Sequence, residues 1–162
     1  MTNTTFDAFS VLLEPLESVW QEPEFHPEGL ALFHSLQVYE HASSESDDPE
    51  LLAAALLHDV GKAQFNDDHA AVGAELLDGL VSPRVTWLVE HHLDLLREPK
   101  KSRALLAGSP WLDDLERLRE WDLAGRSPHA WVPSLDQVLG GLLQPGVAEH
   151  WLTVDAVRKD GL

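Results

Sequence analysis

The side chains of this chain best suited to chemistry are histidines and aspartates that interrupt apolar patterns. His58 and Asp59 follow an unbroken run of Leu and Ala over residues 51–57, and Gly61 and Lys62 come soon after them. An ionised carboxylate buried without a partner is very costly, and a buried imidazole needs hydrogen bonds. The pair therefore predicts a site at the end of this run, where polar side chains have a common partner.

The same feature recurs on other predicted helices, where a polar side chain occupies the apolar face. In "PWLDDLERLREWD", Asp122 continues the spacing of Trp111, Leu115 and Leu118. One such residue alone is explained at least as well by a hydrogen-bonded core side chain or a cap. Several on separate helices favour a divalent cation, which accepts imidazole nitrogen and carboxylate oxygen together. The other inward residues are His34, His69 and His92, and His91 lies on the flank of the stripe that holds His92.

The chain has no cysteine, so a metal site would use nitrogen and oxygen donors. Mg²⁺, Mn²⁺, Fe²⁺, Co²⁺, Ni²⁺ and Zn²⁺ all accept such ligands. Asp59 has two carboxylate oxygens and could bridge two ions, and a bound ion would activate water for hydrolysis. We expect Asp59 and Lys62 to be catalytic, and Lys62 and Arg126 to bind a phosphate of the substrate. For Arg126, a surface position after a helix end is an equally good interpretation.

Helical periodicity dominates the chain, and no segment alternates with period two over a useful length. Proline opens several of the predicted helices, and Asp48, Ser82 and Ser109 are plausible N-caps before three of them. Gly61, Gly108 and Gly125 follow apolar patterns as stop signals. We therefore expect an all-α fold, a single-domain bundle of about seven to nine helices over residues 1–162. The predicted helices cover residues 5–20, 29–43, 49–60, 67–81, 83–96, 99–107, 111–124, 134–143 and 146–158.

Length and charge narrow the classes of function. The 162 residues suit one domain with its own core. With 28 acidic and 11 basic residues, the formal charge of −17 disfavours extended binding to nucleic acid, although it equally serves solubility. A small anionic substrate remains compatible if cations reverse the field locally. The start "MTNTTFDAFS" lacks a signal peptide, and no apolar run approaches the ~20 residues of a membrane span, so we expect a cytoplasmic protein without membrane association.

His34, the "HD" pair at 58–59 and Asp122 resemble the H…HD…D signature of the HD superfamily of metal-dependent phosphohydrolases, and "HDVGK" is a common form of its core. Further stretches are similar to the HD domain of bacterial CCA-adding tRNA nucleotidyltransferases. They are "HPEGLALFHSL" (26–36), "HAAVGAELL" (69–77), "VTWLVEHH" (85–92) and "LREWDLAGR" (118–126). The resemblance covers about residues 25–127, and we expect the N-terminal helix and the segment after 133 to pack on this part.

The resemblance implies a helical bundle around one or two divalent metal ions. It implies that His34, His58, Asp59 and Asp122 bind the first ion and that His69 and His92 bind a second, with His91 as the alternate. It also implies hydrolysis of a small phosphorylated substrate such as a nucleotide, of phosphomonoesterase or 2′,3′-cyclic phosphodiesterase type. No nucleotidyltransferase domain is present, so CCA addition is not expected. In the similar sequences His26 and Glu28 border the site, although Glu28 could equally face the positive end of the next helix.

Two other interpretations stay open. Some HD-like proteins are di-iron oxygenases, and the same six candidate ligands could supply their site. The spacing from Asp59 to His69 resembles the hydrolase members more closely. A non-catalytic metal-binding or nucleotide-binding module is the other alternative. Iron content with O₂ consumption would indicate the former, and tight nucleotide binding without turnover the latter.

Overall fold

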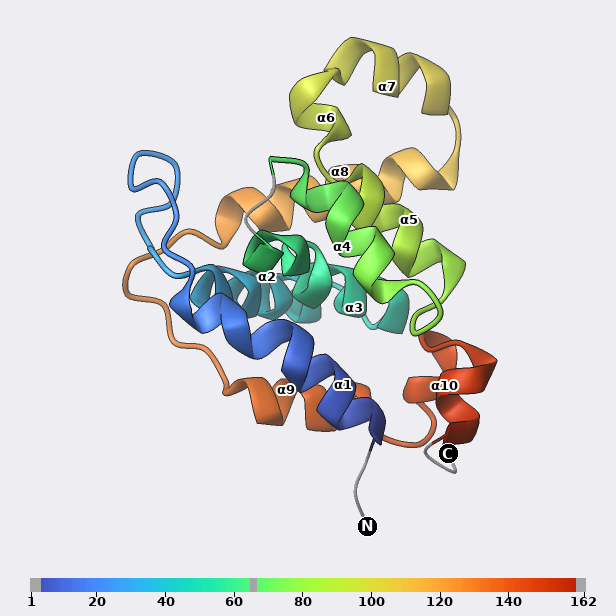
Figure 1. Cartoon of the computed structure of the whole chain (residues 1–162). Helices are drawn as coiled ribbons and strands as arrows, with labels where there is room; N and C mark the ends of the chain where they lie inside the picture. The colour runs from blue at the N-terminus through green and yellow to red at the C-terminus, as the bar shows by residue number, and fades with distance from the viewer. Residues whose placement is uncertain (1–3, 65–66, 160–162) are drawn as a thin grey trace.

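The computed structural model describes residues 4–64 and 67–159, which form helices joined by turns (Figure 1). Apart from two isolated β-bridges, the described residues form no strand, and the all-α expectation is confirmed. With η for a 3-10 helix, the elements are α1 (Thr4–Leu13), η1 (Glu14–Ser18), α2 (Ala31–Glu45), α3 (Pro49–Leu57), η2 (Val60–Gln64), α4 (His69–Leu77), α5 (Pro83–His91), α6 (Asp94–Arg97), α7 (Pro99–Leu106), α8 (Pro110–Ala124), α9 (Leu135–Leu142), η3 (Ala148–His150) and α10 (Val154–Lys159).

Short-range signals set where several helices begin. Proline occupies the start of α3, α5 and α8, where its missing N–H is not needed. The preceding side chain accepts hydrogen bonds from backbone N–H groups of the first turn in each case, as the sequence predicts: Asp48, Ser82 and Ser109. Such a cap contributes about 1 kcal/mol to stability.

Helix α3 lies at the centre of the fold and packs against α2, α5 and α8 (Figure 1). Its residues 53–57 have no solvent exposure. The three consecutive alanines allow neighbouring helices to approach closely, while Leu56 and Leu57 fill the space between them. The apolar run that precedes His58 and Asp59 is therefore the core of the protein, and it carries these two residues into the interior.

The N-terminal and C-terminal elements pack on one another. Phe9 of α1 and Trp151 after η3 are fully buried, and their ring centroids lie 5.1 Å apart. The Trp151 indole also donates a hydrogen bond of 2.7 Å to the Leu142 carbonyl at the end of α9. Both residues belong to the same hydrophobic cluster as α3, so these elements cover one continuous core.

Several predicted helices end earlier than expected, among them 49–60, where α3 ends at residue 57, and 67–81, where α4 ends at residue 77. The predicted helix 5–20 is α1 followed by η1, because Pro15 stands near the start of η1 and cannot donate the hydrogen bond that would continue α1. The predicted helix 83–96 is interrupted after α5 by a turn at residues 92–93 and resumes as α6. Figure 1 shows α6 and α7 as an excursion at the top of the view, between α5 and α8.

The predicted helix 146–158 is wrong for its first half. This segment is a turn, then η3, and only from Val154 the helix α10. Gly146 has a φ of 89°, outside the helical region, and Val81 forms a β-bridge with Leu152. The Ser82 N–H donates to the Trp151 carbonyl, so a tertiary pairing takes a backbone group that a continuous helix would have used internally.

Two glycines bring η2 into close contact with α4. A Cβ atom at Gly61 would lie against the backbone carbonyl of His69 and 2.8 Å from the backbone nitrogen of Gly73. A Cβ at Gly73 would lie 3.3 Å from the Gly61 nitrogen. Gly61 is therefore needed for this close approach, and not only as a stop signal after α3. The approach sets His69 beside the turn that carries Asp59.

Among the residues that the structure describes, no helix combines the length and apolar character required to cross a membrane.

Candidate metal centre

The predicted ligands reach one place from the ends of several helices. His58 and Asp59 follow the C-terminus of α3, and His92 follows that of α5. His69 is the first residue of α4. The remaining two are His34, in the first turn of α2, and Asp122, in the last turn of α8.

Asp59 presents one carboxylate oxygen to each of two histidine pairs. Its Oδ2 atom lies 3.3 Å from His58 Nε2 and 3.6 Å from His34 Nε2. Its Oδ1 atom lies 3.2 Å from His69 Nε2 and 3.4 Å from His92 Nε2. We call His34, His58, Asp59 and Asp122 the first cluster, and Asp59, His69 and His92 the second cluster. Such a carboxylate is placed to bridge two cations.

Asp122 completes the first cluster from α8. Its Oδ1 atom lies 3.0 Å from His34 Nε2 and 3.8 Å from His58 Nε2. The carboxylates of Asp59 and Asp122 thus face the same two imidazole nitrogens. Both aspartates are buried, with 2% and 6% of their surfaces exposed, so water does not screen them effectively.

Backbone carbonyls orient three of the imidazoles. Nδ1 of His58 donates to the Ala55 carbonyl at 2.8 Å, and Nδ1 of His92 donates to the Val89 carbonyl at 2.7 Å. Nδ1 of His34 donates to the Gly125 carbonyl at 2.9 Å. Since a carbonyl only accepts, these bonds place the hydrogen on Nδ1 and leave Nε2 as the atom that can bind a metal.

The inner nitrogens of this site fit a divalent cation. Nε2 of His58, His69 and His92 is buried without a hydrogen-bond partner among the described residues. A buried polar atom without a partner is rare in proteins and usually indicates an ion or water. Imidazole nitrogen with carboxylate oxygen is a donor set that many divalent transition metals accept. Residues of both clusters could therefore hold an ion.

The charges of the side chains in the site also favour a bound cation. Burial by itself lowers the pKa of His58, but the Asp59 and Asp122 carboxylates outweigh it and raise that pKa to about 10. Burial alone would raise the pKa of Asp59, but the positive charges of His58 and Lys62 hold it well below its usual range. The paired carboxylates thus favour a positive charge between them. A divalent ion would take the place of a proton there.

Glu28 lies behind the first cluster. Its buried carboxylate oxygen Oε1 is 3.0 Å from His34 Nδ1 and 2.8 Å from His26 Nδ1. Burial opposes ionisation of Glu28, but the hydrogen bonds from His34 and His26 outweigh it and lower its pKa. The Glu28 carboxylate therefore orients His34 from the side away from the first cluster. The positive end of α2 is not the main partner of this carboxylate.

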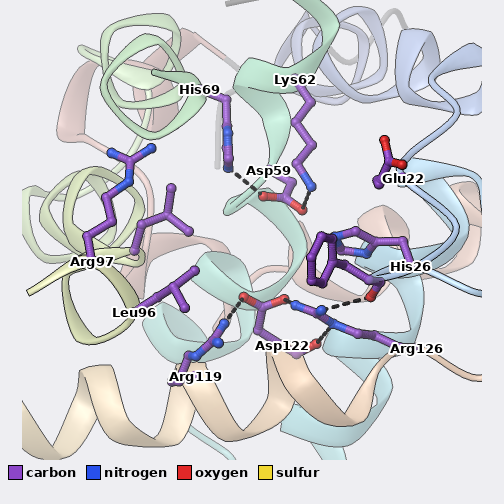
Figure 2. A pocket seen from close by; sticks show the side chains of 12 residues that line it. Glu22, His26, Asp59, Lys62, His69, Leu96, Arg97, Arg119, Asp122 and Arg126 are labelled. Atoms are coloured by element: carbon purple, nitrogen blue, oxygen red, sulfur yellow. Dashed lines mark hydrogen bonds and ion pairs between the residues drawn. The ribbon is translucent and has the colours of Figure 1, made fainter. Parts of the chain in front are cut away.

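A cavity of 550 Å³ opens onto Asp59, His69 and Asp122 (Figure 2). This volume is in the range of small-molecule sites. The remaining lining residues are the basic Lys62, Arg97, Arg119 and Arg126, the apolar Phe25, Leu93 and Leu96, the acidic Glu22, and His26.

The two cations predicted from the sequence both contact the carboxylates. Lys62 Nζ lies 2.9 Å from Asp59 Oδ2. Arg126 donates through Nη2 to Asp122 Oδ1 at 3.3 Å and through Nη1 to the Phe25 carbonyl at 2.8 Å. Arg126 therefore ties the end of α8 to the loop before α2, and it lines the cavity rather than the open surface.

Arg97 and Arg119 are cavity residues that the sequence argument missed. Arg119 stands three residues before Asp122 on α8, and this helical spacing could have identified it. Arg97 reaches the cavity only because the chain turns at residues 92–93, and a continuous helix over 83–96 gives no such indication.

The structure separates the two adjacent histidines of α5. His92 is 3% exposed and belongs to the second cluster. His91 lies outside it, where its Nδ1 is 2.7 Å from Asp94 Oδ2 and its ring stacks on Trp87 with a centroid distance of 4.5 Å. The geometry thus favours His92 over His91 as a ligand.

Comparisons with known proteins agree with this architecture. The fold and the site define an all-helical domain with a buried cluster of histidines and aspartates that could hold a metal ion, and the model of the HD domain family matches residues 32–123. The chain belongs to the HD domain family, whose members are generally metal-dependent hydrolases of phosphate esters. It is 37% identical over 75 residues to the multifunctional CCA protein of Hahella chejuensis (strain KCTC 2396). That match covers 42% of this chain and 18% of the relative, so most of the relative has no counterpart in the match.

Proposed function

We propose that this protein hydrolyses a small phosphate ester with the help of one or two divalent ions, and that the substrate is a nucleotide or a similar molecule. The reaction would be of phosphomonoesterase or 2′,3′-cyclic phosphodiesterase type. The observation that carries the proposal is Asp59, which offers one oxygen to each of two histidine pairs in a cavity lined by cations. Membership of the HD domain family supports the reaction class.

The proposed roles follow from what each residue contacts. His34, His58, Asp59 and Asp122 would hold the first ion, and His69 and His92 would hold a second with Asp59. Ions at such sites lower the pKa of bound water and neutralise phosphoryl oxygens. Phosphoryl transfer needs positioning and charge neutralisation more than covalent catalysis, which fits a site made of ligands and cations.

Lys62 and Arg126 would bind the phosphate. Lys62 is 19% exposed at its side chain, so its ammonium group can reach a phosphate oxygen while it stays beside Asp59. Arg126 has three nitrogen atoms in hydrogen bonds to Asp122 and Phe25, but a guanidinium has five N–H donors, and two remain for a ligand.

The test begins with elemental analysis of the purified protein. Phosphate release is then measured with each candidate metal on nucleoside 2′-, 3′- and 5′-monophosphates and on 2′,3′-cyclic nucleotides. We expect Asp59→Asn to lose bound metal and turnover together, because both clusters lose the shared carboxylate. Asp113→Asn, on the exposed side of α8, is the matched control and should keep both. Circular dichroism verifies that each variant is folded.

Three results would reject the proposal. Full turnover by Asp59→Asn would show that the reaction occurs elsewhere. Two irons per chain with substrate-dependent O₂ consumption would identify an oxygenase that uses the same ligands. Tight nucleotide binding without turnover under any divalent ion would identify a binding module.

A further inference from the structure

Basic residues are scarce in this chain, yet they gather at one cavity. The chain has 11 Lys and Arg against 28 Asp and Glu. Four of the basic residues line the 550 Å³ cavity: Lys62, Arg97, Arg119 and Arg126. Among the residues that the structure describes, the acidic members of the lining are Glu22, Asp59 and Asp122, so this part of the cavity is locally positive on a strongly acidic protein. Divalent ions bound by Asp59 and Asp122 would increase that excess, which favours a ligand of high negative charge.

The four cations divide into two pairs on opposite sides of the carboxylates. Figure 2 shows Lys62 and Arg126 on one side of Asp59 and Asp122, and Arg97 and Arg119 on the other. Under the proposed function, the first pair and the bound ions already account for the phosphate that reacts. The second pair has no role in that reaction.

Within the described part of the chain, Arg97 and Arg119 have few strong partners for their donors. Arg119 Nη1 lies 3.4 Å from Asp122 Oδ2, at the long end of a hydrogen bond. Arg97 Nη1 lies 3.7 Å from Asp68 Oδ1, and both of these side chains are more than half exposed. Exposed pairs of this kind contribute little, so a ligand can displace the Asp68 contact at small cost. Guanidinium groups bind phosphate with two parallel N–H donors, which gives them strength and direction.

We propose that Arg97 and Arg119 bind a second phosphate group of the substrate, so that the preferred substrate is a nucleoside bisphosphate rather than a monophosphate. Two guanidinium groups match the charge of close to −2 that a phosphate monoester carries at neutral pH. Phe25 and Leu96 also line the cavity and are 59% and 55% exposed, so they offer apolar surface to a nucleoside. This inference rests on the proposed function for the first phosphate only.

The test compares adenosine 3′,5′-bisphosphate with adenosine 3′-monophosphate and adenosine 5′-monophosphate on the metal-loaded protein. Isothermal titration gives the dissociation constant of each, and initial rates give kcat/KM where turnover occurs. We expect the wild type to prefer the bisphosphate by about tenfold or more, which corresponds to about 1.4 kcal/mol, since charge-assisted hydrogen bonds from guanidinium to phosphate are stronger than neutral ones. Arg97→Gln and Arg119→Gln should each reduce this preference substantially, and the double variant should abolish it.

Arg103→Gln is the matched control. Arg103 lies on α7, pairs with Glu116 at 3.4 Å and does not line the cavity, so this variant should keep the wild-type preference. Metal content is measured for Arg119→Gln, because Arg119 also contacts Asp122. Equal affinity of the wild type for bisphosphate and monophosphates would overturn the inference, and so would a preference that survives in the double variant. If no nucleotide is hydrolysed, the proposed function fails, while the titration still decides whether a second phosphate is bound.

Discussion

Replacement of Gly61 by alanine tests how the fold positions the second cluster. Gly61 lies in η2, two residues after Asp59, and it faces the first turn of α4. The added Cβ would contact the His69 carbonyl and would lie 2.8 Å from the Gly73 nitrogen. Backbone atoms of a helix cannot rotate away as a side chain can, so η2 and α4 must separate.

The magnitude follows from this overlap. Inserting a methyl group into a closely packed interior typically costs about 1–3 kcal/mol. For a chain of this length, about 1 kcal/mol corresponds to roughly 2–4 °C in Tm, so the expected loss is roughly 2–12 °C. His69 Nε2 is 3.2 Å from Asp59 Oδ1 in the native arrangement, and separation of η2 from α4 would lengthen that distance. We therefore expect weaker metal binding at the second cluster than at the first.

The assay is thermal unfolding of the metal-free protein, together with metal stoichiometry by elemental analysis. Gly140→Ala is the control, because Gly140 lies within α9 and its added Cβ would meet no atom of another described element within 4 Å. An unstrained glycine-to-alanine change in a helix should stabilise the protein by about 0.5–1 kcal/mol. Opposite signs for the two variants would support the argument. An unchanged Tm with unchanged metal content in Gly61→Ala would refute the reasoning that links this contact to the site.

Three further results are expected. His92→Ala should lower the metal content of the protein to that of the first cluster, whereas His58→Ala should remove the ion at the first cluster. Elemental analysis measures both, and loss of all bound ions in both variants would contradict the division into two clusters. Arg84→Met should lower the free energy of unfolding in urea by about 2–3 kcal/mol, because Arg84 Nε and Nη2 each donate to the Asp114 carboxylate at 2.9 Å and the variant leaves that buried group without its partner. Arg84→Lys should recover only part of this loss, since lysine cannot form the paired bonds, and full recovery would show that charge alone matters. Because Asp59 and Asp122 raise the pKa of His58 from 6.5 to about 10, the metal-free protein has this stabilisation in full below pH 6.5 and loses it as the pH rises through about 10. Its Tm should therefore fall between pH 7 and 10, while the Tm of the metal-loaded protein falls less, and parallel curves would refute the exchange of a proton for an ion.

Local signals in the sequence were sufficient to predict where many of the helices begin. Asp48, Ser82 and Ser109 cap the helices that the sequence assigns to them, because a cap involves only residues within one turn. The inward positions of His34 and Asp122 were also predictable, since the apolar stripe of a helix identifies its buried face.

The arrangement within the site depends on contacts that no periodicity encodes. The side of Asp59 that each histidine faces is set by how α2, α4 and α5 pack, and the interruption at residues 92–93 decides where Arg97 lies. The segment 146–158 departs from a helix because residues 81 and 82 pair with it across the fold. The metal roles of the predicted ligands remain predictions, although the structure brings their donor atoms together.

The burial of α3 has a consequence for how ions enter and leave. His58 and Asp59 continue directly from a helix whose residues 53–57 are inaccessible to solvent, so a fluctuation that frees these two side chains must disrupt the most protected part of the molecule. Amide hydrogens of α3 should accordingly be among the slowest to exchange with deuterium. Ion exchange would then proceed by diffusion through the cavity that Lys62 and Arg97 help to line, at a rate independent of backbone opening.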